Sequence, residues 1–309
     1  MATYLITGAT SGLGLQVARR LAHQAEHHLI LPVRDALRGE TLGQNLRTTG
    51  AARVSTPLLD LASLRSVAAF LEAFAQDAGT ELDGVLLNAG IQSATQLAFT
   101  VDGIESTFAI NHLAHHLLIK GLLGRLGRSA WVGWTASGTH DPRETSARLF
   151  GFRGAQYSDA ARVVKGDFGA GVSVTQACKD AYATSKLCNI VSARVFAARH
   201  PQLANFFSFD PGLMPATGLA REQGRAAQWL WHKVLPRLAV LLPGTSSAAK
   251  SSAVLTALLT GQVRAAYNGA YFNYTGQQIE PAPLATEPWV ADDLMAVSDA
   301  LLAPFALYF

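Results

Sequence analysis

A tyrosine and a lysine four positions apart are the residues of this sequence best suited to move a proton. Tyr182 and Lys186 fall in a stretch, 181–199, whose apolar spacing predicts a helix, so both side chains project from one helical face. A tyrosine ordinarily ionises near pH ~10, and a neighbouring positive charge favours its phenolate. The pair therefore predicts a general acid and base at Tyr182, with Lys186 lowering the pKa of the phenol.

Two hydroxyl groups lie where a substrate oxygen could be bound. Thr135 and Ser137 follow or end an apolar stretch, 130–134, that predicts a buried strand. A hydroxyl at the end of a parallel strand can donate a hydrogen bond to a carbonyl oxygen that gains negative charge. On position alone, both residues are candidates for this contact.

A glycine-rich turn separates the first predicted strand, 4–6, from the first predicted helix, 13–24. Its glycines follow the spacing G-x-x-x-G-x-G, and its candidate contacts are Gly8, Thr10, Ser11, Gly12, Leu13 and Gly14. Such a turn lets the backbone approach a pyrophosphate, while the helix N-terminus offers free amides and a favourable dipole. The place of the turn between a strand and a helix predicts a dinucleotide site.

The end of the second predicted strand, 28–32, indicates which dinucleotide is bound. Arg34 and Asp35 follow this strand, where the adenosine ribose would lie. A leading arginine can hold the 2′-phosphate of NADP, whereas a leading carboxylate would bind the 2′-hydroxyl of NAD. The order favours NADPH/NADP⁺ over NADH, with Asp35 as the opposing observation.

Two further strand ends could contact the cofactor. Asp60 and Leu61 follow the third predicted strand, 54–58, and a carboxylate there could accept from the adenine amino group, although Asp60 could equally cap the next helix. Small residues after the fourth strand, 84–87, would let the chain pass close to the cofactor or could form an ordinary turn. These residues are Asn88, Ala89 and Gly90.

Strands and helices alternate along the chain from its first residues. A last apolar run, 206–209, completes six predicted strands, and further helices are predicted at 64–75 and 103–126. Because each parallel connection needs a crossover helix, this order predicts an α/β fold with a doubly wound parallel sheet. No linker composition divides the chain, so 1–309 is expected to form a single domain.

Two segments interrupt this alternation. The first, 139–179, is rich in glycine, alanine and charged residues, and the second, 215–243, carries large apolar side chains such as Trp229 and Trp231. Insertions at the carboxyl ends of strands shape ligand sites in open α/β sheets. The apolar side chains could be plain core, but we favour a lid that lines a pocket for an apolar small molecule.

Taken in order, these motifs resemble the short-chain dehydrogenase/reductase family. The matching stretches are TGATSGLG at 7–14, DL at 60–61, NAG at 88–90, Asn111, Ser137, YATSK at 182–186 and PG at 211–212. The resemblance implies a Rossmann-like sheet, a nicotinamide cofactor and a catalytic tetrad of Asn111, Ser137, Tyr182 and Lys186, in which Asn111 anchors a water of the proton relay. It favours Ser137 over Thr135, because ASGTHDP at 136–142 is similar to a stretch of some members.

The resemblance also implies contacts at the nicotinamide end and an oligomeric state. Tyr182 and Lys186 would contact the cofactor together with Pro211, Gly212, Leu213 and Thr217. The long insertion before Tyr182 is similar to that of monomeric carbonyl reductases, so a monomer or a homodimer is expected instead of a tetramer.

Several stretches narrow the resemblance to one branch. NHLAHHLL at 111–118, SKLCN at 185–189 and PGLMPATGLARE at 211–222 are similar to retinol-dehydrogenase-like members and to light-dependent protochlorophyllide reductases. The light-dependent enzymes typically carry a cysteine after Pro-Gly, where this chain has Leu213. We therefore expect an NADP(H)-dependent interconversion of carbonyl and alcohol. The alternatives are a protochlorophyllide-type C=C reductase and a non-catalytic dinucleotide-binding regulator.

Composition excludes several other classes of protein. A formal charge of +3 over 309 residues, without a basic run, gives no surface for nucleic acid or an anionic membrane. Cys178 and Cys188 are the only cysteines, which favours a reduced, cytoplasmic setting without disulfides. The most apolar later stretch, 229–242, is interrupted by charged residues and proline, so no spanning segment is expected.

Three histidines could suggest a metal. His112, His115 and His116 lie at spacings that would place them on one helical face, and imidazoles at such spacing suit zinc. No acidic partner lies nearby, and this helix is expected to pack against the sheet or a partner subunit. No metal is predicted.

Overall fold

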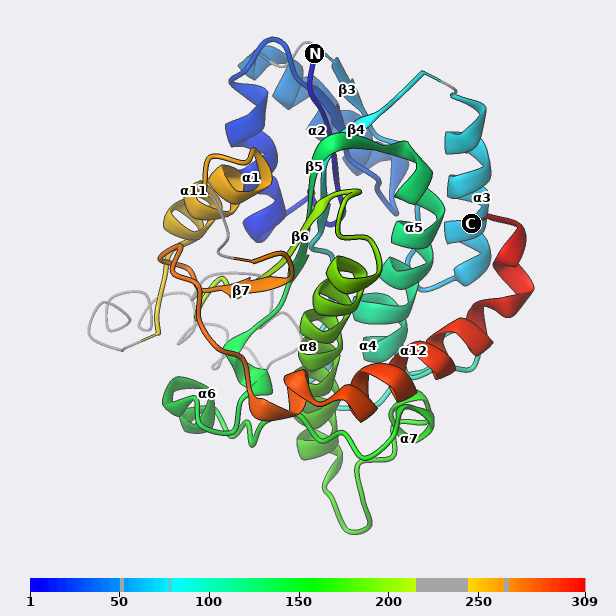
Figure 1. Ribbon diagram of the computed structural model, residues 1–309, viewed down its shortest axis with the longest axis vertical. Coiled ribbons are helices and arrows are strands. Elements are labelled where there is room, and N and C mark those ends of the chain that lie inside the picture. Colours follow the sequence, from blue (N-terminus) through cyan, green and yellow to red (C-terminus); the bar gives the residue numbers. More distant parts are fainter. Residues whose placement is uncertain (51–52, 78, 215–243, 264–266, 309) are drawn as a thin grey trace.

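Seven parallel strands form one sheet in the order β3-β2-β1-β4-β5-β6-β7 (Figure 1). This computed structural model describes residues 1–50, 53–77, 79–214, 244–263 and 267–308. The strands are β1 (Thr3–Ile6), β2 (His28–Ile30), β3 (Arg53–Ser55), β4 (Leu82–Leu87), β5 (Leu126–Thr135), β6 (Asn205–Phe209) and β7 (Ala270–Phe272). The strand order reverses between β1 and β4, and open α/β sheets bind ligands at the carboxyl ends of the strands beside such a reversal.

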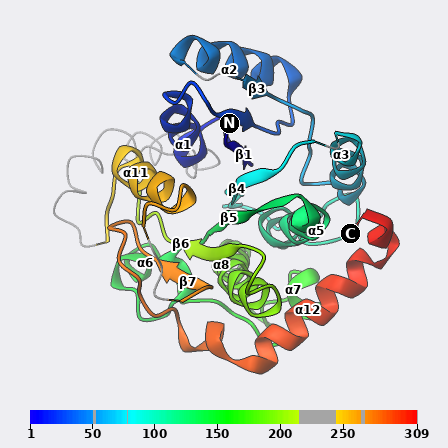
Figure 2. The ribbon, with the colours of Figure 1, turned by 45° about the horizontal axis from the view of Figure 1, so that its top comes forward.

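Helices cover both faces of the sheet, as Figure 2 shows. One face carries α1 (Gly12–Ala22), α2 (Ala36–Thr49) and α11 (Ala248–Leu259). The other carries α3 (Leu64–Gln76), α5 (Ala114–Leu122), α8 (Val174–Arg199) and α12 (Pro288–Leu302). Successive strand residues point to opposite faces, so Leu5 enters one core while Tyr4 and Ile6 enter the other. The predicted doubly wound parallel sheet is confirmed.

The seventh strand was not predicted from the sequence. All six predicted strands are present with shifted ends, and β5 extends four residues further toward the N-terminus than the predicted stretch 130–134. β7 spans only Ala270–Phe272, and its pairing with β6 defines it.

The helix predicted over 103–126 is present from Ser106 to Arg125, but it is not one regular α-helix. Gly103 adopts a φ of 76° in a turn, and a short helix, α4 (Ser106–Phe108), then begins under the carboxylate of Glu105, which accepts the N–H groups of Thr107 and Phe108. A π-helical turn, Ala109–Leu113, follows before α5 begins. Periodicity does not distinguish a π-helical turn from α-helix, because the apolar face continues through both.

The inserted segment before Tyr182 is shorter than predicted. It contains α6 (Thr145–Leu149) and α7 (Ala160–Val164) and ends at Ser173, whose hydroxyl accepts the N–H of Gln176 and caps α8. The helix predicted from residue 181 therefore begins at Val174, within the predicted insertion. The second predicted insertion, 215–243, lies outside the described residues.

Candidate active site

The predicted acid and its lysine lie next to Ser137 at the carboxyl end of β5. Ser137 lies close enough to the Tyr182 hydroxyl to lower the pKa of the phenol. Nζ of Lys186 lies 5.4 Å from the centroid of the Tyr182 ring and donates to the carbonyl of Thr135 at 2.9 Å. Tyr182 is 7% exposed and Lys186 is 3% exposed. The arrangement places a phenol, an alcohol and an ammonium group in one largely dry region.

Ser137, and not Thr135, presents its hydroxyl to Tyr182. The Thr135 hydroxyl instead donates to Oδ1 of Asn88 at 3.3 Å. The carbonyl of Thr135 accepts from both Lys186 and Nδ2 of Asn189, at 2.9 and 3.0 Å. Thr135 therefore holds other parts of the site in place. This distinguishes it from Ser137, the other candidate for the contact with the substrate oxygen.

Asn111 lies in the π-helical turn and is fully buried. Its amide nitrogen donates to the carbonyl of Ile91 and to the hydroxyl of Ser185, both at 3.0 Å, and its Oδ1 accepts from the N–H of Ile91 at 2.8 Å. The Ser185 hydroxyl in turn donates to the carbonyl of Tyr182 at 2.7 Å. The Asn111 side chain thus fixes the loop after β4 and links it to the turn of α8 that carries Tyr182.

A carboxylate that the sequence reasoning did not single out also lies in this region. Asp210 follows β6, and it accepts the N–H of Gly212 at 2.9 Å and the N–H of Gly138. It therefore joins the loop after β5 to the loop after β6. An acidic residue placed directly after a buried strand was the available signal, since such positions meet at one edge of the sheet.

Burial and the charge of Asp210 together set the protonation states of Tyr182 and Lys186. Burial lowers the pKa of Lys186 to about 8, and the negative charge of Asp210 opposes this. Burial raises the pKa of Tyr182, Asp210 raises it further, and the hydrogen bond from Ser137 acts in the opposite direction. Burial also raises the pKa of Asp210 to about 6, against the two backbone amides. Tyr182 is consequently held as a protonated phenol at neutral pH.

The glycine-rich turn between β1 and α1 has the geometry of an anion cradle. Gly8 and Gly12 have φ angles of 70° and 57°, and the space in front of Gly12 is open. A Cβ on Gly14 would lie 2.5 Å from the carbonyl oxygen of Gly8, so this position accepts only glycine without displacing the turn. Ser11 precedes α1 without forming a side-chain cap, which leaves the first amides of the helix for a ligand. These features fit a dinucleotide pyrophosphate.

The turn is fastened to the end of β4. The hydroxyl of Thr7 accepts from the N–H groups of Asn88 and Ala89 at 2.9 and 3.0 Å. Nδ2 of Asn88 donates to the carbonyl of Thr7 at 3.1 Å. Gly90 packs against Asn111, where a Cβ would lie 3.1 Å from Oδ1. The segment 88–90 is therefore part of the framework that places the turn beside the catalytic candidates.

A cavity of about 550 Å³ between α1 and α2 begins at Thr10 and Ser11 and is also lined by Arg19 and Arg38. Arg38 lies in the first turn of α2 and was not singled out from the sequence. Arg34 itself is exposed. A cationic rim beside the glycine-rich turn fits a 2′-phosphate.

Asp35 has two contacts at the start of α2, and in one of them its Oδ2 lies 3.6 Å from Nε of Arg38, so that its charge partly offsets that of Arg38. Its Oδ1 accepts the N–H groups of Leu37 and Arg38 at 3.0 and 3.2 Å, so it is the cap of α2. Asp60 accepts the N–H of Ala62 at 3.0 Å, while Ser63 caps α3, so the alternative that Asp60 is the helix cap is wrong.

The remaining predicted cofactor contacts lie in the two cores, at the end of β6 or outside the described residues. Leu13 and Leu61 are buried in the two cores on opposite faces of the sheet. At the end of β6, Gly212 adopts a φ of 72°, the carbonyl of Pro211 accepts from the Ser251 hydroxyl at 2.7 Å, and Leu213 pairs with the backbone near Thr245. Thr217 lies outside the described residues.

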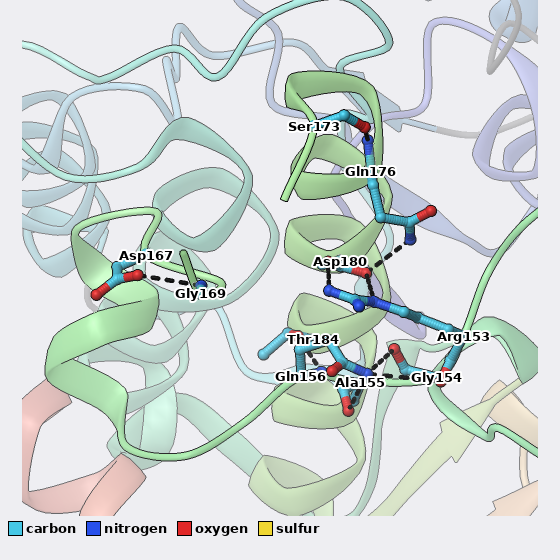
Figure 3. A network of polar contacts seen from close by, with 10 residues as sticks. All are labelled: Arg153, Gly154, Ala155, Gln156, Asp167, Gly169, Ser173, Gln176, Asp180 and Thr184. Atoms are coloured by element: carbon cyan, nitrogen blue, oxygen red, sulfur yellow. Dashed lines mark hydrogen bonds and ion pairs between the residues drawn. The ribbon is translucent and has the colours of Figure 1, made fainter. Parts of the chain in front are cut away.

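The inserted segment is anchored to α8 by a buried carboxylate, shown in Figure 3. Asp180 exposes 1% of its side chain and receives Nε and Nη2 of Arg153 at 3.0 and 2.6 Å. Nε2 of Gln176 donates to the same carboxylate at 2.9 Å. One turn further, the Thr184 hydroxyl accepts the N–H of Gln156 at 2.9 Å. These contacts flank Tyr182 on both sides along α8.

The three histidines do not share one face, contrary to the prediction from spacing. His112 contacts the hydroxyl of Ser298 and His116 contacts the carboxylate of Asp299, both on α12, at 3.0 and 3.1 Å. His115 points toward β1. The π-helical turn changes the angular relation between neighbouring positions. Among the described residues, no group of three or more His, Cys, Asp or Glu side chains could hold a metal ion.

Two other properties follow from the described part of the chain. Cys178 and Cys188 are buried, and neither forms a disulfide. Of the helices in that part, none has the combined length and apolar character needed to cross a bilayer.

Comparison with known proteins places this geometry in a family. The model of the short chain dehydrogenase family matches residues 2–131. Protochlorophyllide reductase of Avena sativa is 33% identical over 238 residues, which cover 71% of this chain and 73% of that protein. The chloroplastic protochlorophyllide reductase of Cucumis sativus is 33% identical over 235 residues, or 71% of this chain, and the match spans only 57% of that relative's length.

Solved structures agree on the fold. An uncharacterized protein from Mycobacterium paratuberculosis is 25% identical with a TM-score of 0.61, over 97% of this chain and 93% of that chain. The NADPH-dependent 3-quinuclidinone reductase from Rhodotorula rubra has a TM-score of 0.63 at 20% identity, over 89% of this chain and 90% of that chain. The chain belongs to the short-chain dehydrogenase/reductase family of oxidoreductases.

Proposed function

We propose that this protein is an NADP(H)-dependent oxidoreductase that interconverts a carbonyl and an alcohol on an apolar small molecule. The observation that carries the proposal is that Tyr182 and Lys186, both largely buried, lie together beside Ser137 at the end of β5, with Nζ of Lys186 5.4 Å from the centroid of the Tyr182 ring. A phenol and an alcohol directed at one point can bind a substrate oxygen and give it a proton. The whole chain, 1–309, would act as a single domain.

Each residue has a distinct part in this reaction. The bound nicotinamide supplies or accepts a hydride at the substrate carbon. In reduction, the Ser137 hydroxyl donates a hydrogen bond to the substrate oxygen while the Tyr182 hydroxyl transfers its proton to the same oxygen. Lys186 lowers the energy of the resulting phenolate by its charge. In oxidation the phenolate takes the proton back. Asn111 keeps the loop after β4 against α8. The resemblance to the family implies that it also anchors a water of the relay.

The proposed preference for NADP(H) over NAD(H) rests on the charged side chains near the glycine-rich turn. Arg38 and Ser11 line the cavity beside the glycine-rich turn, and Arg34 is exposed just before α2, where the sequence predicts the adenosine ribose. The carboxylate of Asp35 caps α2 and also lies near Arg38. A fixed guanidinium recognises phosphate better than it recognises a ribose hydroxyl. A structurally similar short chain dehydrogenase from Burkholderia cenocepacia is in complex with NADP. These observations support NADPH/NADP⁺ in preference to NADH.

The proposal is tested with Tyr182→Phe. This variant should lose at least about 1,000-fold in kcat for any carbonyl or alcohol that the parent turns over, because only the proton donor is removed. Calorimetric titration with NADPH should give a Kd within about threefold of the parent. Parent-like turnover by the variant would show that Tyr182 is not the acid, and failure of the parent to bind either NADPH or NADH would end the enzyme proposal.

A second candidate is the reduction of a C=C bond of the protochlorophyllide type. The two relatives described above are protochlorophyllide reductases, which favours it. Against it, Leu213 stands where similar light-dependent enzymes typically carry a cysteine. Light-dependent loss of absorbance of a protochlorophyllide substrate, with NADPH present, would replace the carbonyl proposal by this one. Cofactor binding with no turnover of carbonyls, alcohols or protochlorophyllide would favour a non-catalytic regulator.

The setting of the protein is part of the same proposal. α12 lies across α5, where Lys120 and His116 both contact Asp299, and this covers a helix face that would otherwise be available to a partner subunit. It supports a monomer or a homodimer, and sedimentation velocity would distinguish these from a tetramer. Cys178 and Cys188 are buried and form no disulfide, which supports a reduced cytoplasmic setting.

A further inference from the structure

A buried histidine lies between the cofactor turn and Asn111. His115 is fully buried at the start of α5. Its Nε2 lies 3.0 Å from the hydroxyl oxygen of Thr7, at the end of β1. Its Nδ1 lies 3.2 Å from the carbonyl oxygen of Asn111. One imidazole therefore contacts both the residue that begins the glycine-rich turn and the main chain of a predicted tetrad member.

The hydrogen bonds around Thr7 determine where the imidazole carries its proton. A hydroxyl oxygen has two lone pairs, and those of Thr7 already accept from the N–H groups of Asn88 and Ala89. The Thr7 proton must then be donated, and Nε2 of His115 at 3.0 Å is a closer acceptor than the carbonyl of Leu86 at 3.4 Å. Since Nε2 accepts, Nδ1 carries the ring proton and donates to Asn111.

We propose that His115 is a positioning residue, a neutral imidazole bridge that fixes the main chain of Asn111 relative to the cofactor turn. Beyond Asn111 the connection continues through the Ser185 hydroxyl to the carbonyl of Tyr182. Displacement of the turn on cofactor binding is thereby coupled to the placement of the proton donor. This inference rests on the proposed function, because it gives the bridge a role in hydride and proton transfer.

The bridge requires a neutral ring. Burial lowers the pKa of His115 to about 4, Lys186 on α8 lowers it further, and the hydrogen bond to Asn111 opposes both. The other histidines of this helix, His112 and His116, face α12 instead. A proton on Nε2 would point at the Thr7 oxygen, whose lone pairs are both in use, so the protonated ring could not keep this contact.

Two substitutions at His115 each remove one of its two hydrogen bonds. The amide of His115→Gln can occupy the place of Nε2 and still accept from Thr7, whereas the amide of His115→Asn can occupy the place of Nδ1 and still donate to Asn111. We expect His115→Gln to keep the Kd for NADPH within about threefold while kcat falls about tenfold, the loss expected of one buried hydrogen bond. His115→Asn should weaken NADPH about tenfold. His112→Gln, one turn before His115 along the chain, should change neither quantity by more than about twofold.

Equal effects of the two His115 variants on Kd and kcat, or parent values for both, would overturn the bridge. Urea unfolding of each variant would identify a folding defect, and the tautomer supplies a readout that does not depend on folding of a variant. In the parent chain labelled with ¹⁵N-histidine, His115 should show a protonated Nδ1 and a bare Nε2 that does not titrate between about pH 5 and 8. A protonated Nε2 at neutral pH would refute the inference. Failure of the proposed function would give a different result from failure of the bridge. The tautomer and the NADPH affinities would then be as expected, but no carbonyl would be reduced.

Discussion

The buried carboxylate that anchors the inserted segment gives a sharp and asymmetric prediction. Arg153 and Asp180 form an ion pair in which the guanidinium side is 45% exposed and the carboxylate side is 1% exposed. Removal of the arginine leaves a carboxylate that water cannot reach. Removal of the carboxylate charge leaves a guanidinium that water can solvate. The two partners should therefore contribute unequally when each is replaced alone.

The magnitudes follow from these exposures. Arg153→Met leaves Asp180 with the single donor Gln176, and an uncompensated buried charge costs about 3–5 kcal/mol in the free energy of unfolding. Asp180→Asn keeps the volume and an acceptor for Arg153, so it loses only the charged part of the hydrogen bonds. That loss is about 1–2 kcal/mol, because the exposed guanidinium recovers its hydration.

Urea unfolding followed by circular dichroism and by tryptophan fluorescence would measure both values at pH 7. The ion pair between Arg162 and Asp167 is the matched control, because its side chains are 44% and 52% exposed. Arg162→Met should cost less than about 1 kcal/mol. The double variant with Met at 153 and Leu at 180 should be more stable than Arg153→Met alone, since no buried charge remains. A cost of Asp180→Asn equal to or above that of Arg153→Met would refute the reasoning.

Three further results are expected. Asp210→Asn removes a negative charge that raises the pKa of Tyr182. Because oxidation needs the phenolate, the acidic limb of the kcat/KM profile for oxidation should move about one pH unit lower. An unmoved limb would contradict the electrostatic coupling between Asp210 and Tyr182. Gly14→Ala should abolish detectable NADPH binding in calorimetry, because its Cβ would lie 2.5 Å from a backbone oxygen; binding within tenfold of the parent argues against the cradle. Arg38→Ala should weaken NADPH about tenfold more than NADH by the same method, and equal weakening would remove Arg38 from the phosphate site.

Local pattern was sufficient for the fold class and for the identity of the central pair. Alternating apolar runs and helix-length segments predicted the doubly wound sheet, because a parallel strand pair cannot be connected without a crossover. Tyr182 and Lys186 were recognised because four residues on a helix are one turn, a relation that the sequence contains by itself. The glycine-rich turn was found for a similar reason, since its position between a strand and a helix is a matter of order along the chain.

Contacts between distant segments were decided only by the tertiary structure. Ser137 was separated from Thr135 by the direction in which each hydroxyl leaves the end of β5, and Asp210 entered the site because β6 pairs beside β5. His115 took its partners from β1 and from a π-helical turn that apolar periodicity does not reveal. A residue's type and its neighbours along the chain determine what chemistry it can perform, whereas its partners and its access to water depend on the packing of elements that are remote in sequence.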